Sequence, residues 1–125
     1  TGVNASTAVG VHHPAGDVMK LAFDDDPTTI TSYYGNAVPG DGSHIRVETW
    51  ERSTTTEGGS SGSALWDQNH RIIGQLHGGY ASCSSQTSDW YGRFYTSWEG
   101  DGSSDTRLKD WLDPKRTGNT FTDTL

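Results

Sequence analysis

Near its centre the chain reads Gly58-Gly59-Ser60-Ser61-Gly62-Ser63-Ala64-Leu65-Trp66, and Arg71-Ile72-Ile73-Gly74-Gln75-Leu76-His77 follows after a short polar turn. By composition alone, a Gly/Ser segment is typical of a flexible linker. Its flanks favour another interpretation, because an apolar run follows without a polar gap and the second run has the pattern of a buried strand. We therefore predict a tight turn between two β-strands at residues 58–63.

Runs rich in Val, Ile, Thr and aromatic residues recur along the chain, and clusters of Gly, Asp and Ser separate them. They predict short strands at residues 9–13, 18–23, 44–50, 63–67, 71–77 and 92–98. Only the C-terminal part, at about residues 104–113, indicates an α-helix. Its signals are a capping segment, an apolar face and a following proline (Ser103-Ser104-Asp105, then Leu108, Trp111 and Leu112, then Pro114). The pattern predicts an all-β antiparallel barrel or sandwich.

Length and composition indicate one acidic domain. The chain has 125 residues, a formal net charge of −7, five Trp and five Tyr. We expect a single domain over residues 1–125, with a thin core to which the aromatic side chains contribute much of the buried area. The negative charge disfavours nucleic acid as a partner. No apolar stretch reaches the roughly 20 residues of a membrane span, so we expect no membrane partner.

Ser61 is the candidate nucleophile. A serine hydroxyl reacts poorly unless a base accepts its proton, and the developing oxyanion needs donors that are fixed in advance. Glycines around the serine let backbone N–H groups converge on one small space. The Gly-x-Ser-x-Gly elbow of the α/β-hydrolases does not fit, because Ser63 occupies its last position and no helix follows. The segment from Gly59 to Gly62 therefore indicates a turn that supports acyl transfer.

From Val11-His12-His13-Pro14 onward, the chain resembles the bacterial lysyl endopeptidases, a branch of the chymotrypsin-like serine proteases. The motifs that carry the resemblance are Thr56-Glu57-Gly58-Gly59-Ser60-Ser61-Gly62-Ser63, Ile73-Gly74-Gln75-Leu76-His77-Gly78-Gly79, Ser88-Asp89-Trp90-Tyr91-Gly92-Arg93, Thr96-Ser97-Trp98 and Arg107-Leu108-Lys109-Asp110-Trp111-Leu112-Asp113-Pro114. The family fold consists of two six-stranded β-barrels with the active site between them. The resemblance places this chain on the second barrel, an antiparallel Greek-key barrel, and on the C-terminal helix.

The resemblance implies roles for the matched residues. Ser61 matches the nucleophile that becomes acylated, and the N–H groups of Gly59 and Ser61 match the oxyanion hole. Asp89 matches the acidic residue that receives a lysine side chain in the specificity pocket. A carboxylate in a narrow, partly dry pocket favours a cationic side chain strongly. No cofactor and no metal ion are implied.

His77, Gly78 and Gly79 match the strand that pairs with an extended substrate, and His77 matches a histidine close to the catalytic group. In the neighbouring glutamyl endopeptidases, the histidine that reads an acidic substrate sits one place earlier, at Leu76. Together with Asp89, this difference favours cleavage after Lys, or after Arg, over cleavage after Glu. Glutamyl-type specificity is the alternative within the enzyme class.

The chain also departs from the family pattern. The triad histidine and aspartate lie on the N-terminal barrel, and no segment of this chain matches that barrel. Ser60 stands where trypsin has the aspartate that pairs with a new N-terminus on activation, so this switch is not expected here. An aromatic residue near the substrate groove, tryptophan in relatives, corresponds to Tyr33 or Tyr34.

We therefore expect the C-terminal half of a serine endopeptidase, inactive alone, whose partners are a peptide substrate and the missing N-terminal barrel. The competing class is a non-catalytic binding module on the same barrel. The residues upstream of Thr1 would discriminate the two, because a Thr-Ala-x-His-Cys-like segment there supports the enzyme.

Cys83 is the only cysteine, so the chain cannot form an internal disulfide. From the residues alone, an idle thiol and a disulfide to another segment are both open. The matching family cysteine pairs with one near the mature N-terminus, so the resemblance implies a disulfide to the missing half. It also implies a secreted, extracellular bacterial protease.

Overall fold

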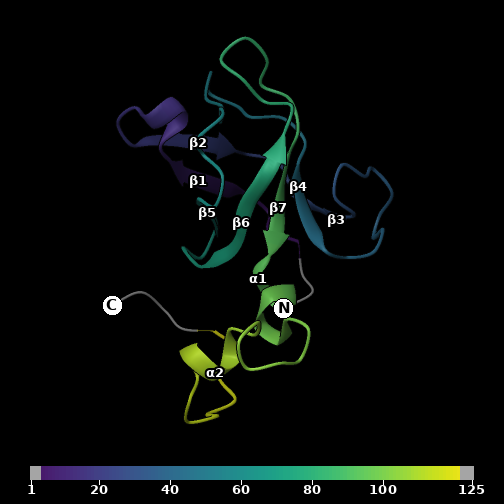
Figure 1. Ribbon diagram of the computed structural model, residues 1–125. Helices are drawn as coiled ribbons and strands as arrows, with labels where there is room; N and C mark the ends of the chain where they lie inside the picture. Colours follow the sequence, from purple (N-terminus) through teal and green to yellow (C-terminus); the bar gives the residue numbers. More distant parts are fainter. Residues whose placement is uncertain (1–3, 122–125) are drawn as a thin grey trace.

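The computed structural model describes residues 4–121 as one antiparallel sheet followed by two short helices (Figure 1). The strands lie in the order β2-β1-β5-β6-β7-β4-β3. A 3-10 turn, η1 (Pro14–Gly16), connects the first two strands. The bounds are β1 Ala8–His12, β2 Lys20–Asp24, β3 Thr29–Thr31, β4 His44–Val47, β5 Ala64–Asp67, β6 Ile72–Gly79, β7 Asp89–Arg93, α1 Phe94–Glu99 and α2 Lys109–Leu112.

The all-β prediction is confirmed, but the sheet has seven strands where the sequence pattern predicted six. The additional strand is β3, which pairs with β4 and is too short to show an alternating pattern. An isolated bridge between Phe23 and Glu51 joins β2 to the segment after β4. This bridge is not a continuous ladder, and the edge strands β2 and β3 do not pair with each other within residues 4–121. The sheet is therefore curled but open, and a closed six-stranded Greek-key barrel is not observed.

The prediction of a strand at residues 92–98 is wrong beyond Arg93, where helix α1 begins. The rings of Phe94 and Trp98 lie about one helical turn apart in sequence, and their centroids are 6.3 Å apart. Aromatic residues four positions apart meet on one face of a helix. This contact outweighs the strand preference of the aromatic side chains, which depends strongly on context. The helix ends at Glu99, and Gly100 follows as its C-cap with a φ of 53°, which favours glycine.

The predicted helix at residues 104–113 is reduced to α2, which begins at Lys109. The Asp101 carboxylate accepts hydrogen bonds from the hydroxyls of Ser103 and Thr106. Residues 101–107 therefore form a locally bonded turn, and Ser103 does not act as a helix cap. The end of the helix agrees with the prediction, because Leu112 is its last residue and Pro114 follows shortly after.

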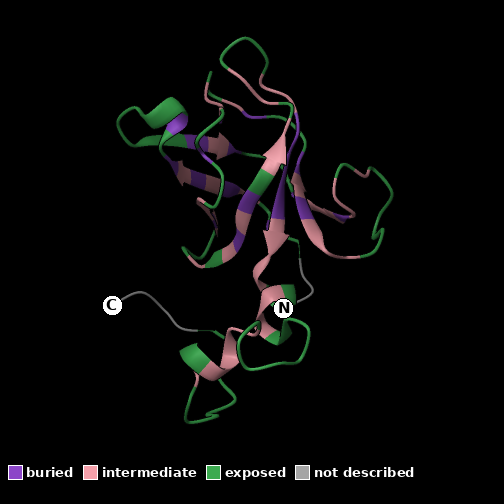
Figure 2. Ribbon diagram, viewed as in Figure 1, coloured by how far each residue is buried: buried purple, intermediate pink, exposed green. Residues whose placement is uncertain are grey.

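The core lies inside the curl of the sheet, where the buried strand residues of Figure 2 gather. It is small, as expected, and its large members are Trp50, Leu65 and Tyr91. Polar side chains are buried beside them, and they include His12 and Asp89. These polar residues connect the core to the candidate site. Among the described residues, no helix is long and apolar enough to cross a membrane.

Candidate active site

The candidate nucleophile lies on a tight turn at residues 57–63, here called the nucleophile turn. The Ser60 N–H donates to the Glu57 carbonyl at 3.1 Å, and the Ser63 N–H donates to the Ser60 carbonyl at 3.1 Å. Gly59 and Gly62 have φ values of 92° and 82°, a conformation that glycine adopts without steric cost. Ser61 is exposed and Ser60 is buried. The turn predicted at residues 58–63 is confirmed, and it directs Ser61 outward.

Three N–H groups of the nucleophile turn, those of Gly58, Gly59 and Ser61, donate to no other group within residues 4–121. The N–H group of Gly62 donates to the Leu76 carbonyl at 2.7 Å. Two of the three unpaired donors, those of Gly59 and Ser61, are the pair that the resemblance assigned to the oxyanion hole. Donors that are fixed by their neighbours and left unpaired can bind an oxygen atom that becomes negatively charged.

The Ser61 hydroxyl makes no hydrogen bond with a histidine in the described part of the chain. The five histidines have other positions. His12 is buried beside Ser60, and His13 lies next to η1. His44 and His77 bond each other, and His70 lies in the turn before β6. A serine without a base is a weak nucleophile. Within residues 4–121, no histidine is therefore placed as a base for Ser61.

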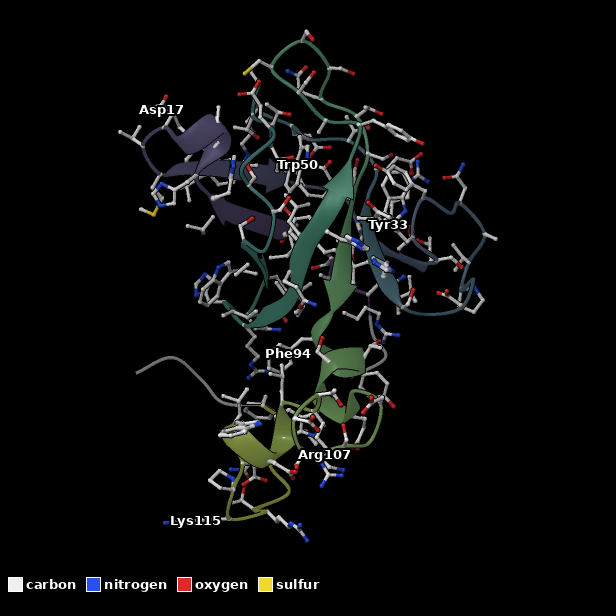
Figure 3. The ribbon with its side chains drawn as sticks, in the orientation of Figure 1. Asp17, Tyr33, Trp50, Phe94, Arg107 and Lys115 are labelled. Carbon is white, nitrogen blue, oxygen red and sulfur yellow. The ribbon has the colours of Figure 1, made fainter. Side chains whose placement is uncertain are left out.

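Asp89, the first residue of β7, lies under the nucleophile turn and is only 2% exposed. One carboxylate oxygen accepts a hydrogen bond from the Trp50 indole at 2.7 Å and another from the Thr56 hydroxyl. Thr56 immediately precedes the nucleophile turn, so this bond links the two parts of the site. The side chain of Trp50 lies inside the curl of the sheet (Figure 3). The second carboxylate oxygen faces Gly79, where an added Cβ atom would lie 2.1 Å from it.

The β6 segment His77–Gly79 has one unpaired edge. β5 pairs with β6 only as far as Gln75, and the Ser63 carbonyl then accepts the Leu76 N–H at 2.8 Å. Beyond this point, β6 pairs with β7 alone among the described residues. An extended peptide can add to such an edge through its backbone hydrogen bonds. The edge begins directly beside the nucleophile turn.

The His77 ring lies on the Tyr33 ring, with centroids 3.8 Å apart and an interplanar angle of 8°. Tyr33, at the outer side of β4 in Figure 3, is therefore the aromatic neighbour of this histidine. His77 Nδ1 lies 2.9 Å from His44 Nε2, and His44 Nδ1 lies 2.7 Å from the Ser43 hydroxyl. Burial and then the neighbouring His77 lower the pKa of His44. His44 was not among the predicted site residues, because only the pairing of β4 with β7 brings it to His77.

Cys83 is exposed on the loop between β6 and β7. Its backbone N–H donates to the Glu57 carboxylate at 3.3 Å, which places the cysteine close to the nucleophile turn. A hydrogen bond with the Glu57 carboxylate raises the pKa of the thiol, with smaller contributions from desolvation and from the Glu57 charge. The disulfide to another segment stays a prediction.

The family model described as lysyl endopeptidase, C-terminal domain, matches residues 1–92. The matched range contains the nucleophile turn, the unpaired edge of β6 and Asp89, and it ends within β7. The chain therefore belongs to the family of lysyl endopeptidase C-terminal domains.

Proposed function

We propose that this chain is the C-terminal half of a secreted serine endopeptidase that cleaves after Lys, or after Arg, through an acyl-enzyme on Ser61. The observation that carries the proposal is the nucleophile turn, which carries an exposed serine and, at Gly59 and Ser61, N–H groups without a partner among the described residues. Membership of a protease family supports a peptide substrate and a companion N-terminal domain.

The arrangement of the site supports a stepwise acyl transfer. A substrate strand pairs with the edge His77–Gly79, and this places the scissile carbonyl at the nucleophile turn. Ser61 Oγ attacks the carbonyl carbon while a base from the companion domain accepts its proton. The N–H groups of Gly59 and Ser61 donate to the resulting oxyanion. The C–N bond then breaks, the amine leaves with the proton from the base, and water later hydrolyses the acyl-enzyme.

Asp89 supports the preference for a cationic side chain. Its two hydrogen bonds from Trp50 and Thr56 hold one carboxylate oxygen, and the other oxygen stays free to face a substrate ammonium group. Because Asp89 is buried, its attraction for a cation is screened less than that of a surface carboxylate. Gly79 keeps the space in front of this oxygen free of a side chain.

A fluorophosphonate probe tests the role of Ser61. We expect rapid labelling of Ser61 in the complete protease and none in its Ser61→Ala variant. The 125-residue chain alone should label slowly or not at all, because no described histidine hydrogen-bonds Ser61. Rapid stoichiometric labelling of the pure chain would contradict the need for a companion domain. Absence of labelling in the complete protease would contradict the proposed function.

Peptides that differ only at the residue before the scissile bond test the specificity. We expect cleavage after Lys, or after Lys and Arg, and none after Glu. Preferred cleavage after Glu would support the glutamyl alternative.

Cys83 offers a separate test. In non-reducing peptide maps of the secreted protease, we expect Cys83 in a disulfide with the N-terminal segment.

A further inference from the structure

The buried side of the nucleophile turn is attached to β1. Ser60 is 1% exposed, and its hydroxyl lies 2.8 Å from Nδ1 of His12, the last residue of β1. The same hydroxyl lies 3.4 Å from the Glu57 backbone N–H, which donates to it. The inward-facing Ser60 side chain is therefore held both by β1, through His12, and by Glu57, the first residue of the nucleophile turn. Ser61, the next residue, faces outward.

A second contact attaches the same turn to the segment that follows β1. The Ala15 N–H in η1 donates to the Gly58 carbonyl at 2.7 Å. An added Cβ atom at Gly59 would lie 3.2 Å from the Ala15 nitrogen, so the two backbones are closely packed. The Ala15–Gly58 bond restrains the peptide unit that carries the Gly59 N–H. The contact with His12 holds the Ser60 side chain, next to the peptide unit that carries the Ser61 N–H.

The burial of His12 calls for an explanation beyond packing. The side chain is 1% exposed, and its Nε2 atom has no partner among the described residues. Burial lowers the pKa of His12, although the Asp89 carboxylate acts in the opposite direction, so the ring is neutral at physiological pH. A buried polar atom without a partner costs free energy, and an apolar side chain would avoid this cost. The hydrogen bond that the His12 ring makes among the described residues joins its Nδ1 atom to the Ser60 hydroxyl.

We propose that His12 is a positioning residue for the oxyanion hole. Its neutral ring holds Ser60, and together with the Ala15–Gly58 bond it fixes the direction of the Gly59 and Ser61 N–H groups. In trypsin, the residue at the place of Ser60 is an aspartate that a charged N-terminus restrains; here a neutral pair, His12 and Ser60, provides the restraint within one domain. The inference rests on the proposed function, because it concerns how the same turn is held.

The test uses the complete protease and its variants His12→Leu, His12→Asn and Ser60→Ala. Asparagine can present a polar atom near the position of Nδ1, whereas leucine cannot. Because the loss of one oxyanion donor lowers kcat by about 10²–10³-fold, we expect loosened donors to lower kcat by about tenfold. We expect this decrease in His12→Leu and Ser60→Ala, with KM changed less than twofold. His12→Asn should recover most of kcat, and the double variant His12→Leu/Ser60→Ala should lose no more than either single variant.

His13→Ala is the matched control, since His13 is the exposed neighbour of His12 and its Nδ1 atom lies 3.1 Å from the Asp17 carbonyl oxygen. Its kcat should equal that of the wild type. If His12→Leu does not fold, the Ser60→Ala variant still tests the positioning role, because this substitution removes only a single oxygen atom.

The two proposals fail differently. An active wild type with unchanged kcat in Ser60→Ala would overturn the positioning role alone. Equal losses in His12→Asn and His12→Leu, or additive losses in the double variant, would also overturn it. A wild type that neither cleaves peptides nor reacts with the fluorophosphonate probe would overturn the proposed function.

Discussion

The substitution Asp89→Asn separates the charge of the candidate specificity pocket from its shape. Asparagine has nearly the same size, and its side-chain oxygen can accept the hydrogen bonds that Trp50 and Thr56 donate to Asp89. The amide nitrogen then occupies the place of the second carboxylate oxygen, which faces Gly79. The packing is therefore kept, while the group that meets a substrate ammonium becomes neutral.

The size of the effect follows from the burial of Asp89, which is 2% exposed. Removing one partner of a buried ion pair costs about 3–5 kcal/mol. Since 1.36 kcal/mol corresponds to a factor of ten in rate, kcat/KM on a lysine substrate should fall by roughly 10²–10⁴-fold. A substrate with norleucine in place of lysine has the same chain length without the charge. Its kcat/KM should change by less than about threefold, because an amide and a carboxylate differ little for an apolar partner.

The assay measures kcat/KM of the complete protease and its Asp89→Asn variant on matched lysine and norleucine peptides. Asp24→Asn is the matched control, because Asp24 is also 2% exposed and lies on β2, away from the nucleophile turn. It should leave both values unchanged. The reasoning would be refuted if Asp89→Asn lowered kcat/KM on the two peptides by the same factor. That result would assign Asp89 a structural role through Trp50 and Thr56.

Two further predictions concern stability. Burial raises the pKa of the Asp24 carboxyl from 3.8 to about 7, so the folded protein loses stability as the pH rises from about 4 to about 7. In urea unfolding, Asp24→Asn should stabilise the protein by about 4 kcal/mol at pH 8 and by less than about 1 kcal/mol at pH 4. If the stability difference between the variant and the wild type did not depend on pH, the raised pKa of Asp24 could not be its cause. Gly79→Ala should lower the free energy of unfolding by about 1–3 kcal/mol, because its Cβ atom would overlap with Asp89. The control Gly58→Ala meets no atom within 4 Å and should change stability by less than about 0.5 kcal/mol, so equal effects of the two substitutions would exclude a steric cause.

Local patterns were sufficient for most of the strands and for the nucleophile turn. β1, β5 and β6 lie within about two residues of their predicted positions, because each combines an apolar run with turn residues at its ends. The Gly/Ser segment was recognisable as a turn because apolar residues follow it directly. The predictions failed where the local signal was weak or ambiguous. Three residues are too few to show the alternation of β3, and the aromatic residues of α1 suit a strand equally well.

The sequence by itself determined the chemistry that this chain can offer: a serine in a glycine-rich turn and an acidic residue at position 89. Only the tertiary structure decided which side chains meet. His12 bonds Ser60 across 48 positions, and Trp50 bonds Asp89 across 39. These contacts arise from the pairing of β1 with β5 and of β4 with β7. The pairing of distant strands depends on the whole sheet, so no local pattern could predict which polar groups would be buried together.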